Sequence, residues 1–73
     1  MRLDCNDPDV ESTHWRTYLD GVERPASIAD TERGMMLVLD HPPRSDPLTN
    51  KPVMKWIRGR VEILDVVSGK IYR

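Results

Sequence analysis

The chain has 73 residues, 38% of them hydrophobic, and a formal net charge of −1 at pH 7. This length allows one domain with a small core, and the single cysteine, Cys5, excludes an internal disulfide. No apolar run approaches the roughly 18 residues of a membrane span, and the acidic N-terminus lacks the apolar segment of a signal peptide, so we expect a soluble cytoplasmic protein.

Residues 1–13 form a polar, acidic N-terminal segment. Within it, Asp7-Pro8-Asp9 predicts a turn, because proline fixes its own φ and disfavours helix at the residue before it. Leu3 could be the centre of a short edge strand over residues 1–5. We expect the remainder of the segment to be a loop.

Asp20-Gly21 predicts a two-residue β-hairpin. A type I′ turn requires positive φ at both central positions, which Asp tolerates and Gly adopts without steric cost. Strands are predicted at 14–19 and 22–28, with Leu19 opposite Val22, and with Pro25 at an edge position or a break. One face of this hairpin then carries Trp15, Thr17, Leu19, Val22 and Ala26, and the other carries Arg16, Tyr18 and Glu23.

A tight turn is predicted at 30–34, where Asp30 can cap the exposed amides and Gly34 can adopt the left-handed conformation. The strand that follows, 35–40, is apolar nearly throughout, which is typical of a strand that is central or covered on both faces. Residues 41–52 contain four prolines, so neither a helix nor a central strand fits there. A proline-rich loop of this length is either functional or mobile, and its composition favours a mobile loop.

The last long apolar segment is a strand predicted at 53–66. Gly59 lies inside it as either a bulge in one bent strand or the turn of an Arg58-Gly59 hairpin. The bulge is favoured, because the alternation of Ile57, Val61 and Ile63 stays in phase across the glycine. Ser68-Gly69 is a second hairpin signal, after which residues 70–73 can fold back as a short final strand.

Motifs for metal binding or catalysis do not emerge from the residue spacing. The three strongest transition-metal ligands, Cys5, His14 and His41, lack the spacing of a zinc site. The acidic residues at 4–9 do not match an EF-hand loop, and residues 68–70 do not match the end of a phosphate-binding loop. We therefore expect no cofactor, no metal site and no enzymatic activity.

Charge is distributed unevenly along the chain. Residues 1–50 carry five arginines against ten carboxylates, whereas residues 51–73 carry six cations against two carboxylates. In the basic part Trp56 shares a strand face with Arg58 and Arg60, while Lys55 points to the opposite face. Together with two residues of the hairpin, these define a candidate surface for a protein partner or a nucleic acid: Lys55, Trp56, Arg58, Arg60, Arg16 and Tyr18. The acidic balance of the whole chain favours a protein partner.

Four segments together resemble small uncharacterised proteins encoded by bacteriophages and prophages. They are Met-Arg-Leu-Asp-Cys-Asn-Asp-Pro at the N-terminus, Tyr-Leu-Asp-Gly-Val-Glu in the hairpin, Ala-Asp-Thr-Glu-Arg-Gly at 29–34, and Gly-Arg-Val-Glu-Ile at 59–63. The resemblance covers most of residues 1–64. It implies a bacterial cytoplasm and a small accessory role, and it supplies no activity, cofactor or binding residue.

The sequence therefore predicts a single all-β domain over residues 1–73, built as an antiparallel meander of four to five strands that could curl into a partial barrel. We expect a non-enzymatic accessory protein of phage or prophage type that binds an unidentified protein partner and could form a homodimer. The alternative is a small β domain that binds nucleic acid through its basic C-terminal strand. A membrane is not among the expected partners.

Overall fold

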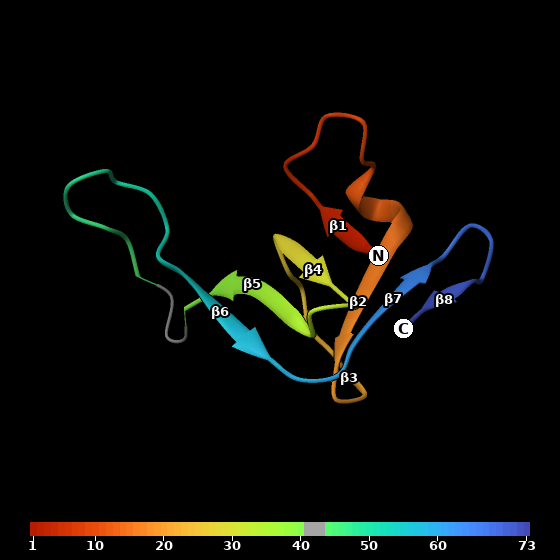
Figure 1. The fold of residues 1–73 in the computed structure, drawn as a ribbon. Helices are drawn as coiled ribbons and strands as arrows, with labels where there is room; N and C mark the ends of the chain where they lie inside the picture. Colours follow the sequence, from red (N-terminus) through yellow and green to blue (C-terminus); the bar gives the residue numbers. More distant parts are fainter. Residues whose placement is uncertain (41–43) are drawn as a thin grey trace.

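The computed structural model describes residues 1–40 and 44–73, which fold into short β-strands with one 3₁₀ turn at Ser12–His14 and no α-helix (Figure 1). Sheet A contains β1 (Arg2–Asp4), β4 (Ile28–Asp30), β5 (Met35–Leu39) and β6 (Met54–Arg58) in that order. Sheet B has the order β3 (Val22–Glu23), β2 (Trp15–Leu19), β7 (Val61–Asp65) and β8 (Ile71–Tyr72). Every pairing within the two sheets is antiparallel.

The core lies between the inner faces of the two sheets. Sheet A contributes Leu3, Ala29, Met36 and Val38, and sheet B contributes Val61 and Ile63, all of them buried. Met36 and Ile63 are completely buried, and Thr17 of β2 is buried opposite Ile63. At one end of sheet B the rings of Trp15 and Tyr72 lie 6.2 Å apart. Because the side chains of a strand point alternately to its two faces, every second residue of these strands enters the core.

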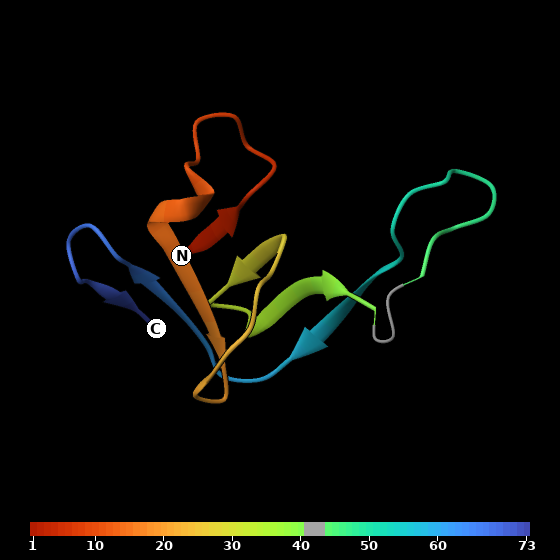
Figure 2. The same ribbon diagram turned by 180° about the vertical axis from the view of Figure 1, so that it is seen from behind.

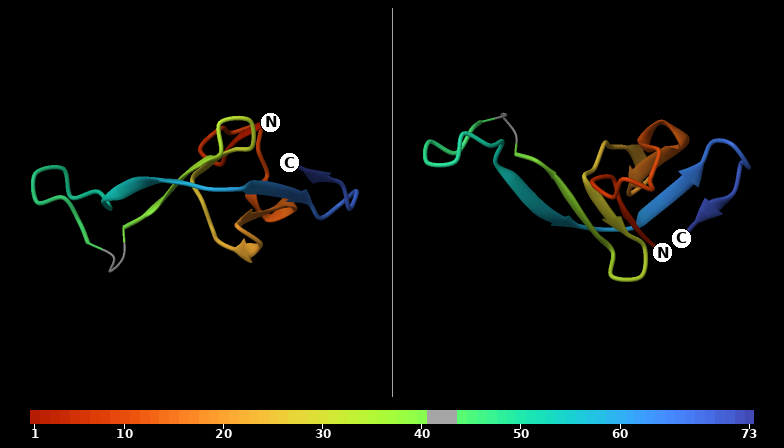
Figure 3. Two further views of the ribbon diagram at one scale, coloured as in Figure 1. Left: turned by 60° about the horizontal axis from the view of Figure 1, so that its bottom comes forward. Right: turned by 90° about the horizontal axis from the view of Figure 1, so that it is seen from above.

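Three connections cross between the sheets, and the first runs through residues 5–14 from β1 to β2. Residues 24–27 carry the chain from β3 to β4, and Gly59-Arg60 carries it from β6 to β7 at the corner seen from above in Figure 3. Gly59 N donates to Gly34 O at 3.0 Å, and a Cβ on Gly34 would lie only 2.8 Å from Gly59 O. The β4–β5 turn therefore packs tightly against this corner, where only glycine fits.

The β5–β6 hairpin extends away from the rest of the molecule, as Figures 1 and 2 show from opposite sides. Its projection makes the protein elongated, with extents of 40 × 26 × 18 Å. Beyond the strands, a Ser45–Pro52 bridge and a hydrogen bond from Asp46 N to Lys51 O (2.8 Å) join the two sides of the proline-rich segment. Residues 41–43, including His41, lie outside the described residues.

The predicted all-β, antiparallel fold is confirmed, with no closed barrel. The strands divide between two sheets rather than forming one meander, because β3 and β4 separate after Glu23 and β6 and β7 separate at Gly59. Pro25 therefore marks a break, because the pairing of β2 with β3 covers only Tyr18 with Glu23 and Leu19 with Val22 and the predicted strand 22–28 ends at Glu23. The predicted bulge in one strand over 53–66 is wrong, because β6 ends at Arg58 and β7 begins at Val61 in the other sheet. An Arg58-Gly59 hairpin is excluded too, since β6 and β7 pair with different strands. The predicted phase of Ile57, Val61 and Ile63 is confirmed, because all three face the core.

The predicted turns are also confirmed. Asp20 and Gly21 have φ values of +52° and +83°, and Leu19 pairs with Val22 as expected. Asp20 makes a second contact that the turn signal does not predict, because its Oδ1 accepts the Arg60 backbone N–H at 2.9 Å. The Ser68-Gly69 signal corresponds to the β7–β8 hairpin, in which Gly69 has a φ of +77°. Leu3 lies in the edge strand β1, and residues 35–39 form the strand β5 between β4 and β6.

Candidate functional site

The outer face of sheet A carries apolar side chains that do not reach the core. Directly paired residues of antiparallel strands share a face, so Ile28, Leu37 and Trp56 form one continuous row across β4, β5 and β6. Met35 lies in the next row, between Asp30 and Arg58. We call Ile28, Met35, Leu37 and Trp56 the Trp56 patch. The core contains the alternate residues of the same strands, so the patch faces away from it.

The Trp56 patch is open to solvent. Trp56 is 48% exposed, and its three apolar neighbours are only partly buried. A hollow of about 120 Å³ lies on this face, lined by Arg2, Ile28, Asp30, Arg33, Met35 and Trp56. Its volume is that of a single side chain rather than a metabolite, since ligand pockets usually enclose about 300 Å³ or more. The hollow can therefore hold one anchoring residue of a partner.

Three exposed arginines surround the patch: Arg2 on β1, Arg33 in the β4–β5 turn and Arg58 on β6. Arg33 Nε lies 3.9 Å from Asp30 Oδ2, whereas Arg58 has no ion-pair partner within residues 1–40 and 44–73. Asp4 and Asp30 lie on the same face but are less exposed. The exposed charge beside the Trp56 patch is therefore mainly positive.

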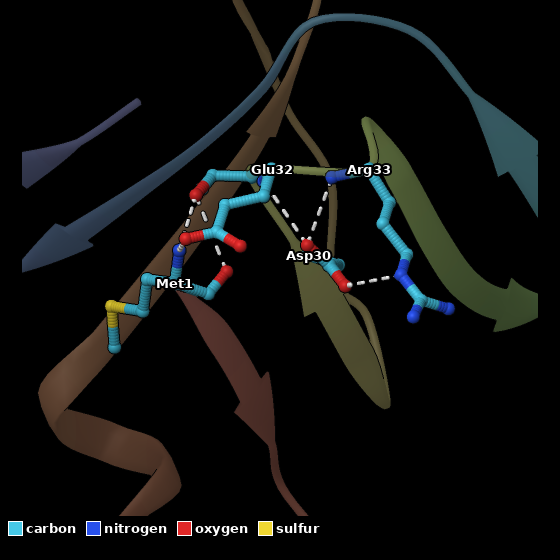
Figure 4. Close-up of polar contacts among 5 residues, drawn as sticks. Met1, Asp30, Glu32 and Arg33 are labelled. Carbon is cyan, nitrogen blue, oxygen red and sulfur yellow. Dashed lines mark hydrogen bonds and ion pairs between the residues drawn. The ribbon is translucent and has the colours of Figure 1, made fainter.

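Asp30 is held in place by the turn that it caps. Its Oδ1 accepts the backbone N–H groups of Glu32 and Arg33, both at 3.0 Å (Figure 4). The hydrogen bond from the Arg33 backbone lowers the pKa of Asp30 most strongly, and the Glu32 amide and the nearby positive charges act in the same direction against burial. The N-terminal ammonium of Met1 donates to Thr31 Oγ1 at 2.8 Å and lies 3.7 Å from Glu32, which ties β1 to this turn. The side of the hollow formed by Asp30 and Arg33 is thus well anchored.

The strand β6 forms a free edge of sheet A. Asp40 N donates to Val53 O and Gly59 N donates to Gly34 O, both at 3.0 Å, which marks Val53 and Gly59 as hydrogen-bonded positions of the β5–β6 ladder. Hydrogen-bonded positions recur at every second residue. Met54, Trp56 and Arg58 therefore direct their backbone N–H and C=O groups away from β5, toward an edge that no described strand occupies.

The structure brings only part of the sequence-predicted surface together. Trp56 and Arg58 share the outer face of sheet A, and Arg60 follows beyond the corner, where it lies 3.7 Å from Glu62. Lys55 is on the opposite face, as its position beside Trp56 predicts, with its Nζ 3.6 Å from Asp40.

Arg16 and Tyr18 lie on sheet B, in strand β2, and are therefore separate from the Trp56 patch. Arg16 Nη1 is 3.6 Å from Glu23 Oε1, and Tyr18 pairs with Glu23 and Glu62. This outer face of sheet B is occupied by ion pairs.

Five residues in or beside the Trp56 patch were not predicted as site residues: Ile28, Met35, Leu37, Arg2 and Arg33. A signal for two of them, Met35 and Leu37, exists in the sequence. Residues 35–39 are apolar at both odd and even positions, yet a small domain needs only one face of that strand for its core. The other face is then either covered or available to a partner. For Arg2 and Arg33 no local signal exists, since turns and pairings remote in sequence bring them to the patch.

A second depression lies between the β2–β3 hairpin and the distal end of β5–β6. It has a volume of about 1070 Å³ and is lined by apolar residues such as Val22, Pro25 and Leu39 together with Asp20, Glu23 and Lys55. Val22 is 68% exposed there. The charged residues that line this open groove are of both signs, and they do not point toward one common position.

Groups that could hold a metal do not converge in the part of the chain that the structure describes. Cys5 is partly buried, and burial, assisted by the charge of Asp4, raises the pKa of its thiol. Among residues 1–40 and 44–73 there is no helix long and apolar enough to cross a membrane.

Comparisons of the chain with protein-family models, with curated proteins and with solved structures found no match.

Proposed function

We propose that the protein is a non-enzymatic binding module that docks another protein on the Trp56 patch. The observation that carries this proposal is the apolar outer face of sheet A. Trp56 is 48% exposed there, and the other three residues of the Trp56 patch are only partly buried and do not contribute to the core. Exposed apolar surface with a tryptophan at its centre is typical of protein interfaces, where tryptophan and arginine dominate the binding energy.

The charges around the patch indicate the chemistry of the partner. Arg2, Arg33 and Arg58 flank the hollow, and arginine pairs with carboxylates in a bidentate manner. An apolar side chain flanked by Asp or Glu would place the apolar group in the hollow and the carboxylates beside the arginines. We therefore propose that the partner presents an acidic segment with one apolar anchor.

A nucleic acid is the second candidate, because the same three arginines surround a half-exposed tryptophan that could stack on a base. Asp4 and Asp30 on the same face oppose a polyanion. Titration of a single-stranded oligonucleotide at about 50 mM salt would quench tryptophan fluorescence if this candidate is correct, and the signal would decline steeply as salt rises. An unchanged spectrum at that salt concentration excludes it.

The docking proposal is tested by capturing partners from an extract of the producing cell with the wild-type protein, with Trp56→Asp and with Leu48→Asp. Leu48 is 93% exposed and lies outside the patch, so its variant controls for a lost surface hydrophobic residue. A protein captured by the wild type and by Leu48→Asp, but not by Trp56→Asp, is then purified and titrated calorimetrically. Direct binding that Trp56→Asp weakens at least about ten-fold supports the proposal. Binding that is equal for all three forms overturns it.

The cellular setting that we propose is the cytoplasm of a bacterium carrying a phage or prophage, which the sequence resemblance suggests. Self-association through the Trp56 patch is the competing use of this surface. Like-charged arginines would face one another across such a contact, which disfavours it. Light scattering at tens of micromolar protein distinguishes the two, because a monomer mass leaves the patch available to another protein.

A further inference from the structure

We infer that the partner binds as an extended acidic segment that adds a fifth strand to sheet A along the free edge of β6. This inference rests on the proposed function, since it specifies how a protein partner engages the surface around Trp56. Strand addition is a recurrent form of peptide recognition, in which backbone hydrogen bonds supply affinity and alternate side chains supply specificity.

The free edge of β6 has unused hydrogen-bonding groups. The N–H and C=O groups of Met54, Trp56 and Arg58 point away from β5. Val53 and Gly59 are hydrogen-bonded to the β5 side, and residues 54, 56 and 58 occupy the alternate positions of the strand. β6 has five residues, whereas the other edge strands, β1, β3 and β8, have three, two and two. Proteins usually keep exposed edges short to avoid uncontrolled pairing. A five-residue edge bearing an exposed tryptophan is therefore the one suited to strand addition.

The charges along this edge select an acidic strand. Residues 47–61 contain four cations, at 51, 55, 58 and 60, and no Asp or Glu. Lys55 and Arg60 each lie within 4 Å of a carboxylate elsewhere in the protein, at Asp40 and Glu62. Neither Lys51 nor Arg58 has an ion pair within the described residues. A strand rich in Glu or Asp would neutralise this edge, and a basic strand would be repelled.

The same charges argue against a second copy of this protein as the added strand. Antiparallel pairing of two β6 strands would bring two sets of these cations together along one edge, with no carboxylate between residues 47 and 61 of either copy. Like charges on adjacent strands are destabilising. The occupant of the edge is therefore a segment of a different, acidic chain.

The Trp56 patch determines which side chains of the added strand matter. Residues of the incoming strand that lie opposite Trp56 share its face of the sheet, next to the exposed indole. Every second residue of the segment should therefore be apolar. The intervening residues point to the other face, where Lys55 lies. The expected segment alternates apolar and acidic residues over about seven positions, or about 23 Å at the usual strand rise.

The test uses a terminally blocked seven-residue peptide of alternating glutamate and valine, labelled with fluorescein, and measures its anisotropy with the full-length protein. The control peptide has lysine in place of every glutamate. Two further peptides carry backbone N-methyl groups, one on its valines and the other on its glutamates. Alternate N–H groups of a strand face the same neighbour, so one methylated peptide should lose at least about ten-fold in affinity and the other less than about two-fold.

Two protein variants test the charge contribution: Lys55→Gln, on the face of β6 that the glutamates should reach, and Arg16→Gln on the outer face of sheet B. Both side chains are about half exposed and each lies 3.6 Å from a carboxylate of the protein, so the two substitutions are matched and neither should disturb the core. Lys55→Gln should weaken the glutamate peptide about two- to five-fold, and Arg16→Gln should leave its affinity unchanged. Binding of the lysine peptide, equal effects of both methylations, or equal effects of both variants would overturn the inference.

Failure of this inference can be distinguished from failure of the proposed function. If the glutamate peptide does not bind, but a purified partner still binds the wild type and not Trp56→Asp, strand addition is wrong and the docking surface stands. If neither the peptide nor any protein binds in a Trp56-dependent manner, both are wrong.

Light scattering tests the choice of an acidic partner over a second copy. A dimer that becomes more stable in Arg58→Glu would overturn that choice, because the variant supplies a carboxylate on the edge of each copy.

Discussion

Replacement of Gly34 by alanine is expected to destabilise the protein more than the same replacement at Gly69. Both glycines have left-handed backbone conformations, with φ of +63° at Gly34 and +77° at Gly69. Their surroundings differ. A Cβ on Gly34 would lie 2.8 Å from the backbone oxygen of Gly59, whereas a Cβ on Gly69 would have no atom within 4 Å. Gly69→Ala is therefore a control for the conformational cost alone.

The expected magnitudes follow from these two effects. A left-handed conformation costs a residue with a side chain about 1–2 kcal/mol, which applies to both variants. The close approach at Gly34 adds about 1–3 kcal/mol, as in an overpacked core, because the contact is with backbone that cannot rotate away. Gly34→Ala should thus lose about 2–5 kcal/mol. A domain of this size has a total stability of about 4–11 kcal/mol, so the loss is large.

Thermal and urea unfolding, both followed by tryptophan fluorescence, measure the two variants, since Trp15 and Trp56 report on sheet B and sheet A respectively. The Gly34→Ala melting temperature should fall at least about 4 °C further than that of Gly69→Ala, as about 1 kcal/mol corresponds to 4–8 °C in a small domain. Equal losses for the two variants would refute the close packing of the β4–β5 turn against the corner at Gly59. An unfolded Gly34→Ala protein together with a folded Gly69→Ala protein agrees with it.

Three further predictions concern single contacts. Asp20→Ala should lower the free energy of unfolding, measured in urea, by about 1–3 kcal/mol, and Asp20→Asn should lower it much less. Asn tolerates the left-handed backbone conformation and keeps an acceptor for the Arg60 N–H. Equal losses for the two variants would contradict this reasoning. The pKa of Asp30 is lowered in the folded state, so its contribution to stability is present above about pH 4 and is lost as the pH falls through the folded value. Urea midpoints at pH 6 and pH 3 should therefore differ less in Asp30→Asn than in the wild type, and an identical pH dependence would disprove the role of Asp30. Ile63→Val should lower the free energy of unfolding by about 0.5–1.5 kcal/mol and exposed Val66→Ala by much less, which the same unfolding experiment checks.

Local signals in the sequence predicted the turns well. Asp20-Gly21, Asp30 with Gly34, and Ser68-Gly69 each occur where backbone conformation depends on the residues of the turn itself. The assignment of strands to sheets depends instead on contacts between distant residues, such as Thr17 with Ile63. Nothing near either residue in the sequence indicates that pairing. For this reason the all-β class could be predicted, but the division into two sheets could not.

The candidate site was predicted only in part for a related reason. Trp56 and Arg58 were identified because they alternate on one strand, and Lys55 was correctly expected on the opposite face. Arg16 was grouped with them on the basis of charge, although it lies on sheet B beside Glu23. Charge and aromatic content show which residues can bind a partner. Which of them share a surface is decided by strand pairing across the whole chain.

The pairing of β2 with β7 also determines how the protein must fold. β4 and β5 are separated by four residues and β5 and β6 by fourteen, whereas β2 and β7 are separated by 41. Closing so long a loop is costly in entropy unless the intervening strands are already ordered. Sheet A would therefore form early and sheet B late. Substitutions in the β4–β5 turn would then slow refolding, whereas those in β8 would mainly accelerate unfolding.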